Sequence, residues 1–171
     1  MRVTIIATSL DEESKSQEIA KNFKSKLEAK GFEVSIFDLR EIELPLSGHS
    51  SSWENANAKI ISESIKCSTH VVFAVPIYCY GVNAAAKNII ELCNKAFTKK
   101  IISFICSAGG EMSYMSVMSF ANQLMLDYRS IIVPRFAYVT ASGWHEDQVT
   151  EEVDQRLDIL MQDMESIRVT V

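Results

Sequence analysis

The sequence predicts a doubly wound α/β fold, a three-layer sandwich in which helices cover both faces of a five-stranded parallel sheet. Two observations lead to this prediction. Continuous apolar runs rich in β-branched residues recur along the chain, which is typical of strands buried on both faces. Between these runs, apolar residues recur at spacings of three and four, which indicates amphipathic helices. Strand and helix alternate five times, so the strands are expected to pair in parallel.

Length and composition limit the classes of protein to consider. The chain has 171 residues, which suits one domain over residues 1–171, and 47% hydrophobic with 23% charged residues is ordinary for a globular protein. A formal net charge of −5 argues against a general nucleic-acid binder, which would carry a basic face. The apolar run over residues 3–7 is too short for a signal-peptide core, and no run reaches the length of a membrane span. We therefore expect a cytoplasmic protein without a nucleic-acid or membrane partner, with reduced and mostly buried cysteines.

The amino-terminal part of the chain contains two expected strands and two expected helices. The first strand is a continuous apolar run, whereas the second alternates apolar and polar residues, as an edge strand does. Ser14 suits the N-cap of the first helix, and Gly31 suits its end. The expected elements are strands over residues 3–8 and 32–39, helices over 14–31 and 53–65, and a long loop over 41–52.

The centre of the chain is the stretch around which the fold is organised. An apolar run over residues 71–75 predicts a strand buried on both faces, and Pro76, which has no N–H to donate, ends it. Over residues 82–97 the apolar spacing predicts a helix. The connection Ile77-Tyr78-Cys79-Tyr80-Gly81 puts two aromatic residues and a glycine on a tight turn. Such a strand-to-helix turn in the middle of the chain is a candidate ligand-binding loop.

The carboxy-terminal part repeats the pattern of strand and helix. A third continuous apolar run, residues 101–106, is followed directly by Ser107-Ala108-Gly109-Gly110. Apolar positions at helical spacing follow over residues 114–128 and again over 149–167. The last strand is expected over residues 131–139, where Pro134 indicates a bulge or an unpaired edge position.

Five strands suit the flavodoxin-like order 2-1-3-4-5, in which the strand order reverses between the first and third strands. Ligands bind outside the carboxyl ends of the strands at such a point. This order brings together the loops that follow Thr8, Pro76 and Cys106. The sequence therefore predicts one site built from these three loops.

Each of the three loops has a functional and a purely structural interpretation. The hydroxyls of Ser9, Ser14 and Ser16 lie at the start of a helix, which favours an anion, but the acidic residues from Asp11 to Glu13 oppose one and are typical of a well-capped helix. The two tyrosines can stack on an aromatic ligand or lie buried, and the Gly109–Gly110 pair can admit a flat ligand or serve only the turn. The convergence of the three loops favours a binding site.

These residues resemble the motifs of the NAD(P)H-dependent FMN reductases, a flavodoxin-like family that includes quinone and azo-dye reductases. The family's phosphate loop, G-S-x-R-x-x-S-x-x-x-x-L-A, is similar to the segment over residues 8–20, in which Ser9, Ser14, Ile19 and Ala20 match. In this register Thr8 replaces the glycine and Asp11 replaces the arginine.

The family's other motifs are matched later in the chain. The second motif, P-x-Y-x-G-S-x-P-A-x-L-K-N, is similar to residues 76–88, with matches at Pro76, Tyr78, Lys87 and Asn88. Here Tyr80-Gly81 replaces the glycine–serine pair and Asn83 replaces the second proline. The third motif, S-x-G-G, is matched by Ser107, Gly109 and Gly110, and Val133-Pro134 in the last strand is also similar to the family.

The resemblance implies a flavin-dependent oxidoreductase that passes a hydride from NAD(P)H to bound FMN and on to a quinone, azo compound, metal ion or free flavin. No catalytic acid–base pair is required, because the flavin carries the chemistry. The three histidines show no spacing of metal ligands, so no metal site is expected. The resemblance places the FMN phosphate at Ser9, Ser14 and Ser16, and the ring against Pro76, Ile77, Tyr78, Cys79, Tyr80, Gly81, Ser107, Ala108, Gly109 and Gly110.

Two other interpretations stay open from the sequence. One is an electron carrier of the flavodoxin type, although the phosphate loop lacks the density of threonine and glycine typical of that group. The other is a flavin-free or weakly flavin-binding protein that keeps the fold for a binding role, which Asp11 supports. Fold alone does not decide among them.

A homodimer or tetramer is also expected. The predicted helix that begins near Met112 carries Met115, Phe120 and Leu126 outside its core stripe. A helix that is apolar on more than one side usually has a second burial partner. The family resemblance, in which the flavin pocket lies near a subunit interface, implies the same.

Overall fold

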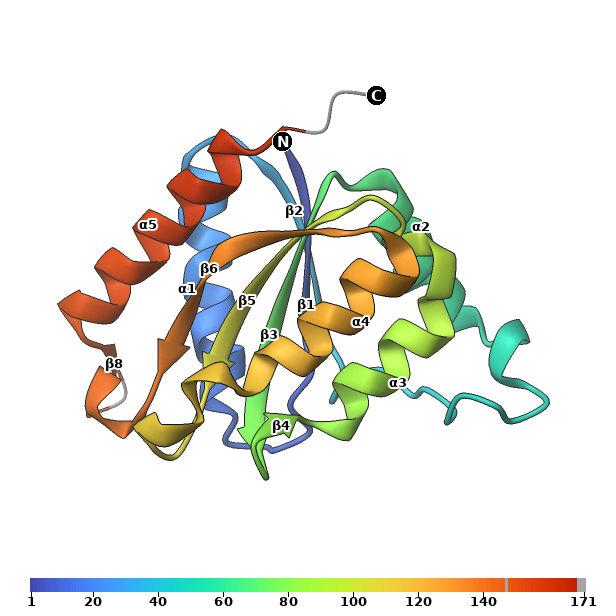
Figure 1. Cartoon of the computed structure of the whole chain (residues 1–171), viewed down its shortest axis with the longest axis horizontal. Helices are drawn as coiled ribbons and strands as arrows, with labels where there is room; N and C mark the ends of the chain where they lie inside the picture. The colour runs from blue at the N-terminus through green and yellow to red at the C-terminus, as the bar shows by residue number, and fades with distance from the viewer. Residues whose placement is uncertain (147, 169–171) are drawn as a thin grey trace.

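A computed structural model describes residues 1–146 and 148–168 of the chain. Five parallel strands form the body of the central sheet in the order β2-β1-β3-β5-β6, which confirms the predicted flavodoxin-like order (Figure 1). A short sixth strand, β4, pairs antiparallel with β3. The strands are β1 (Arg2–Ala7), β2 (Glu33–Asp38), β3 (His70–Tyr78), β4 (Gly81–Val82), β5 (Ile101–Ser107) and β6 (Ile131–Val139).

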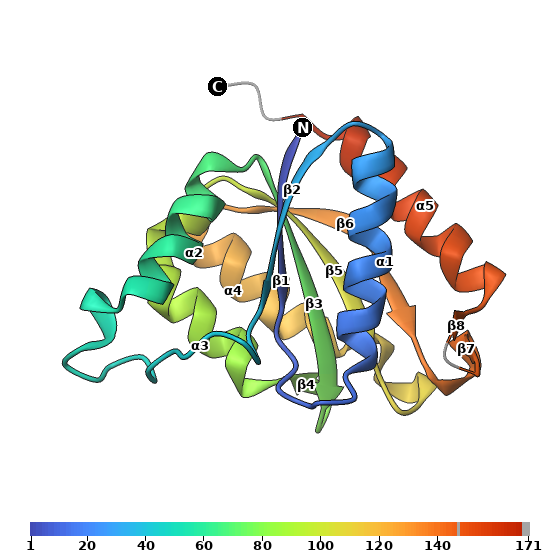
Figure 2. The same cartoon turned by 180° about the vertical axis from the view of Figure 1, so that it is seen from behind.

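Five α-helices cover the two faces of the sheet. Helices α1 and α5 lie on one face, and α2, α3 and α4 lie on the other, as the two opposite views show (Figures 1 and 2). This arrangement explains the continuous apolar runs, because β1, β3 and β5 have neighbours on both sides and helices on both faces. The helices are α1 (Lys15–Ala29), α2 (Ala56–Cys67), α3 (Ala84–Cys93), α4 (Met118–Tyr128) and α5 (Glu151–Ser166).

Aromatic rings fill the core on the face covered by α2, α3 and α4. Phe73 on β3 stacks on Phe104 of β5 at 6.1 Å between ring centroids and meets the edge of Phe120 at 5.2 Å. All three side chains are almost completely buried. Phe120 therefore belongs to the core, and its predicted place on a second apolar face of the helix was wrong.

Short helices and a ribbon complete the chain. The ribbon pairs β7 with β8 antiparallel just before α5. These elements are the 3-10 helices η1 (Ser52–Glu54), η2 (Asn94–Phe97), η3 (Glu111–Val117) and η4 (Ala141–Gly143), and the strands β7 (Trp144–His145) and β8 (Gln148–Val149).

The helix predicted over residues 82–97 begins later and ends earlier. Gly81 and Val82 pair with Tyr78 and Ile77 across a two-residue turn, so the chain forms a hairpin before α3 starts at Ala84. The α-helix ends at Cys93, and a 3-10 turn continues to residue 97. Helical spacing of apolar residues does not distinguish the hairpin from a first helical turn, which is why the sequence misplaced this boundary.

Two other predicted helices are also shorter than expected. Residues 114–117 belong to the 3-10 helix η3, which is kinked at Ser113, and only Met118–Tyr128 is α-helical. Trp53 lies in η1 and is 53% exposed, and α2 starts at Ala56 with Asn55 as its N-cap. An N-cap side chain that accepts a backbone N–H fixes where such a helix starts.

Pro134 marks a bulge, as predicted. Ile132 of β6 is opposite Ile102 of β5, and Phe136 is opposite Phe104, so β6 contains two more residues than β5 between these pairs. The extra residues include Pro134, which has no N–H for the ladder.

The cysteines divide into two groups, so the expectation of mostly buried thiols holds for only half of them. Cys67 and Cys79 are exposed, whereas Cys93 and Cys106 are buried. Burial raises the pKa of Cys93 to about 12 and raises the pKa of Cys106 still further. None of the helices in residues 1–146 and 148–168 is both long and apolar enough to cross a membrane.

Candidate functional site

A cavity of about 500 Å³, the loop cavity, opens at the carboxyl ends of β1, β3, β5 and β6. Its volume lies in the range of small-molecule sites. The structure brings together residues from all three of the predicted loops at this cavity. The predicted site residues that line it are Ser9, Ser14, Ser16, Pro76, Ile77, Tyr78, Ser107, Ala108 and Gly109.

Three serine hydroxyls stand at the start of α1 on one side of the cavity. Ser14 caps the helix as predicted, because its Oγ accepts the N–H of Gln17 at 3.2 Å. The Oγ of Ser16 lies 3.0 Å from the Oγ of Ser14, and Ser9, Ser14 and Ser16 are all at least 95% buried. Buried hydroxyls at the positive end of a helix form a polar, anion-favouring end of the cavity.

Acidic side chains line the same end. Asp11 donates its backbone N–H to Ser9 Oγ at 3.3 Å, and its Oδ1 accepts the N–H of Glu13 at 3.0 Å. The carboxylate thus occupies a loop N–H that an anionic ligand would otherwise use. Among the described residues, Asp11, Glu13 and Glu146 line the cavity together with one cation, Lys15, so its charged lining groups sum to a negative value.

Arg40, which was not predicted as a site residue, holds the outside of this loop. Its guanidinium donates to the backbone oxygens of Asp11 (3.2 Å) and Glu12 (2.8 Å) and pairs with both carboxylate oxygens of Asp38. Burial alone would raise the pKa of Asp38, but hydrogen bonds and charge from Arg40 outweigh it and lower that pKa. The only signal in the sequence was an arginine two residues after the Asp that ends the second strand, which is too common a pattern to predict this role.

Thr8 and Asn83, two positions at which the sequence departs from the motifs, bond to each other. Thr8 Oγ1 donates to Asn83 Oδ1 at 2.7 Å, and Asn83 Nδ2 donates to the backbone oxygen of Thr8 at 2.6 Å. Both residues are buried. Although Asn83 stands at the N-cap position of α3, its side chain is used for this bridge and makes no capping bond. The bridge fixes the start of the first loop to the start of α3.

The hairpin after β3 presents one aromatic residue, Tyr78, at the cavity. Tyr78 lines the cavity and is 51% exposed, whereas the predicted site residues Cys79, Tyr80 and Gly81 form the hairpin beyond it and do not line it. Cys79 and Tyr80 have φ values of 50° and 59°, a conformation that favours Gly or Asn in such turns. Tyr80 is 72% exposed.

The loop after β5 is held in place by Tyr138 of β6. The hydroxyl of Tyr138 donates to the backbone oxygen of Gly110 at 2.5 Å and lies 2.7 Å from Ser113 Oγ. Ala108 donates its N–H to Val139 O at 2.9 Å. Gly110 itself, although predicted as a site residue, lies outside the cavity lining, and Gly109 is the glycine that faces it.

A fourth loop, between β6 and α5, closes the cavity and was missed from the sequence. Thr140, Ala141, Trp144 and Glu146 line the cavity from this loop, and the Nζ of Lys15 lies 4.5 Å from the centroid of a Trp144 ring. The position of this loop directly after a parallel strand could have predicted its role, because all loops that follow parallel strands meet at the same edge of the sheet.

Lys87 and Asn88, which match the second motif, serve the fold outside the cavity. Asn88 accepts the N–H of Ser47 at 2.8 Å and donates to Pro45 O at 2.9 Å, which ties the long loop before α2 to helix α3. Lys87 forms an i,i+4 ion pair with Glu91 at 3.1 Å.

The residues present fit a flat aromatic ligand with a polar tail. The Pro76–Tyr78 and Ser107–Gly109 segments provide backbone and ring surfaces, and the three serine hydroxyls provide donors at the start of α1, where the ring of Trp144 lies against Lys15. A flavin with its ring between the strand-end loops and its tail at α1 matches this division. The acidic groups, Asp11 first among them, oppose a phosphate on that tail.

Comparison with known proteins shows the family of the chain. Residues 1–146 match the family model described as NADPH-dependent FMN reductase. No curated protein sequence matches the chain.

Several solved structures share the fold. An apo NADH:FMN oxidoreductase superposes with a TM-score of 0.81 at 12% identity, covering 99% of this chain and 91% of its own. The flavoenzyme NAD(P)H:acceptor oxidoreductase of Paracoccus denitrificans gives a TM-score of 0.70 at 18% identity, covering 95% and 98%. The azoreductase of Bacillus anthracis gives 0.67 at 15% identity, covering 94% and 97%. At these identities the likeness concerns the fold.

Proposed function

The chain belongs to the NADPH-dependent FMN reductase family and is an oxidoreductase that uses FMN, with NAD(P)H as co-substrate; from this premise we propose that the loop cavity is its flavin site. The cavity at the carboxyl edge of the sheet, lined by all three predicted loops, is the observation that carries the proposal. Bound FMN supplies hydride transfer from the nicotinamide to an electron acceptor.

The residues of this chain then bind and orient the two ligands. Ser9, Ser14, Ser16 and the N-terminus of α1 hold the polar tail, and the bridge between Thr8 and Asn83 keeps that loop in position. Tyr138 keeps the Ser107–Gly110 loop against the ring through its bond to Gly110 O. We propose that the exposed Tyr78 and Tyr80 pack against the ring that approaches the flavin from solvent.

The absorption spectrum of the purified protein tests the flavin site first. We expect the visible bands of a flavin, either on purification or after addition of FMN and removal of the excess. Anaerobic stopped-flow mixing with NADPH and with NADH should then bleach those bands promptly. A flavin that binds but is not bleached by either nucleotide would instead indicate an electron carrier of the flavodoxin type.

The final acceptor is proposed to be an aromatic compound such as a quinone, an azo compound or a second flavin. The support is the pair of exposed tyrosines, because aromatic rings pack well on exposed aromatic side chains. Steady-state rates with a benzoquinone, an azo dye, free FMN and ferric citrate test this choice. A ferric rate above the three aromatic rates would contradict it.

A second candidate function is a binding role in which the flavin is held only weakly, and the acidic lining favours it. Asp11, Glu13 and Glu146 face the end of the cavity where a phosphate would bind. Absence of binding of both FMN and riboflavin, measured by flavin fluorescence at micromolar protein, would support this second candidate over the first.

We also propose that the protein acts in the cytoplasm as a homodimer. Met112, Met115 and Leu126 are between 60% and 89% exposed on η3 and α4, and this apolar surface supports a second burial partner. Light scattering at micromolar concentration should give twice the 19.2 kDa of one chain. A monomeric mass would contradict the proposal.

A further inference from the structure

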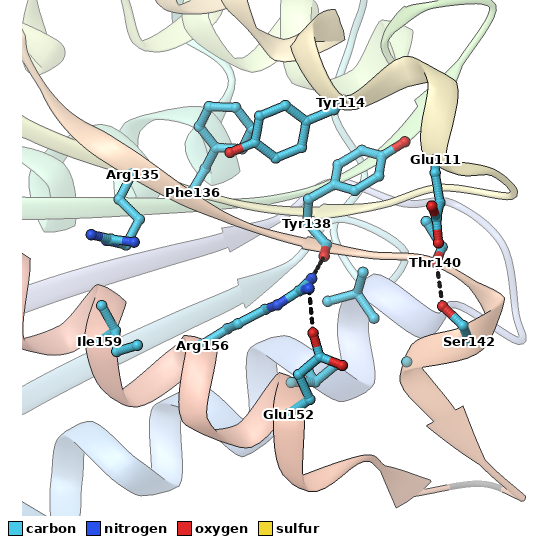
Figure 3. A pocket seen from close by; sticks show the side chains of 13 residues that line it. Glu111, Tyr114, Arg135, Phe136, Tyr138, Thr140, Ser142, Glu152, Arg156 and Ile159 are labelled. Carbon is cyan, nitrogen blue, oxygen red and sulfur yellow. Dashed lines mark hydrogen bonds and ion pairs between the residues drawn. The ribbon is translucent and has the colours of Figure 1, made fainter.

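A second cavity of about 480 Å³, the edge cavity, lies beside the loop cavity at the free edge of β6 (Figure 3). Its walls come from η3, β6 and α5. Thr140 lines both cavities, and Tyr138, which bonds to Gly110 O, lines the edge cavity. A ligand in the edge cavity therefore lies next to one in the loop cavity.

Three aromatic rings form one side of the edge cavity. Tyr114 packs on Phe136 with 4.8 Å between ring centroids and an angle of 31° between ring planes, and Tyr138 meets Tyr114 at 5.4 Å and 72°. Figure 3 shows the three rings grouped together above the strand. Tyr114 is 47% exposed, so this wall keeps accessible ring surface for a flat heterocycle.

Two guanidinium groups line the cavity from β6 and α5. Arg156 donates to the backbone oxygen of Tyr138 at 2.9 Å and to Glu152 at 2.5 Å, and Arg135 donates through Nε to Asp163 at 2.5 Å. A guanidinium has five N–H donors, so within residues 1–146 and 148–168 these contacts leave donors on both arginines for a ligand. Arginine forks match the geometry of phosphate groups.

The carboxylates of the edge cavity are weak competitors for an anion. Glu111 and Glu152 also line it. Glu152 forms an i,i+4 ion pair with Arg156, and the Glu152 side chain is 73% exposed. Exposed ion pairs of this kind contribute little free energy, because water screens the two charges. An anion with several oxygens can displace such a partner.

We infer that the edge cavity binds the adenosine diphosphate half of the nicotinamide dinucleotide co-substrate. The purine packs on Tyr114 and Phe136, and the phosphates bond to Arg135 and Arg156. Thr140 lines both cavities, so a dinucleotide that extends past Thr140 can place one half in each cavity. The inference rests on the proposed function, since it takes the nicotinamide to lie in the loop cavity.

Calorimetric titration of the full-length protein with ADP tests the ligand of the edge cavity without any turnover. We expect Arg135→Gln and Tyr114→Ala each to weaken ADP binding about tenfold. The matched control is Arg2→Gln, because Arg2 also carries an exposed guanidinium paired with a carboxylate, at 2.9 Å from Glu33, and lies at the start of β1. No detectable ADP binding, or an equal loss in Arg2→Gln, would overturn the inference.

A comparison of kcat/KM for two reductants tests whether the ADP bound in the edge cavity corresponds to the adenosine diphosphate half of the co-substrate. Reduced nicotinamide mononucleotide lacks the adenosine diphosphate half, so the ratio of kcat/KM for NADPH to kcat/KM for the mononucleotide should fall about tenfold in Arg135→Gln. ADP that binds without competing with NADPH would reveal a separate nucleotide site and overturn the assignment. If neither nucleotide reduces the flavin while ADP binding stays intact, the proposed function fails and the ligand of the edge cavity stands.

Discussion

Replacing Asp11 by arginine should tighten FMN binding by ~30- to 150-fold and should leave riboflavin binding nearly unchanged. Asp11 lines the end of the loop cavity where Ser9, Ser14 and the start of α1 favour an anion. Its carboxylate occupies the N–H of Glu13 at 3.0 Å. The substitution removes this negative charge, frees that N–H and adds a planar donor fork.

The magnitude follows from the position of Asp11 near the surface. Its side chain is exposed, so water screens its charge, and two unit charges about 4 Å apart in water interact by ~1 kcal/mol. Reversing the charge changes the interaction with a phosphate by two such units. With the gain of a charge-assisted hydrogen bond, the total is on the order of 2–3 kcal/mol, which corresponds to the ~30- to 150-fold expected.

Fluorescence titration of FMN and riboflavin against both proteins measures the effect. Glu12→Arg is the matched control, since it makes the same charge change at the next residue, which lines a neighbouring depression rather than the loop cavity. Added salt should strengthen FMN binding to the wild type and weaken it in the variant, because salt screens repulsion in one and attraction in the other.

Three results would refute this reasoning. Equal changes for FMN and riboflavin, or no change for either, would show that Asp11 does not face a phosphate. An equal gain in Glu12→Arg would show that only the overall charge of the loop matters.

Three further predictions concern single side chains. Tyr138→Phe should weaken riboflavin binding several-fold, because it removes the hydrogen bond to Gly110 O. Tyr128→Phe removes a similar hydrogen bond, to Ile90 O on α3, and should leave riboflavin binding unchanged. Equal Kd values for riboflavin in the two variants would contradict this prediction. Tyr80→Ala should raise the KM for NADPH with little change in Tm, since Tyr80 is 72% exposed, and a large fall in Tm would instead mean that Tyr80 supports the fold. His70 is buried, and burial lowers its pKa despite its bond to Met164 O, so the unfolded chain binds the additional proton. Its contribution to stability should be complete above about pH 6.5 and should be lost as the pH falls below that value, which urea unfolding from pH 8 to 5 would show against His70→Gln.

The sequence was sufficient for the sheet order because the signals there are strong and local. Continuous apolar runs of strand length identify strands buried on both faces, and Ser14 and Pro134 carry specific backbone consequences that the structure confirms. The order of the strands then follows from five parallel strands and short connections.

The sequence could not give the parts that depend on contacts between distant segments. The hairpin at Cys79 and Tyr80 has none of the glycine or asparagine that usually signals its backbone conformation. Trp144 reaches the loop cavity because Gly143 packs closely beneath its loop, where a Cβ would stand 2.7 Å from Val139 Cγ1. That contact joins β6 to the following loop, and no local spacing rule predicts it.

The bridge between Thr8 and Asn83 couples the departures that this sequence shows from two separate motifs. A glycine at position 8 would leave Asn83 Oδ1 without its hydroxyl donor, and a proline at position 83 would leave the buried carbonyl of Thr8 without its amide donor, at ~1–3 kcal/mol for each unsatisfied group; the Thr8 hydroxyl would keep its bond to Ala74 O at 3.3 Å. Either single reversion to the motif residue is therefore worse than keeping both departures or reverting both. The first loop and the start of α3 therefore act as one structural unit, in which a change at either position is expected to require a change at the other.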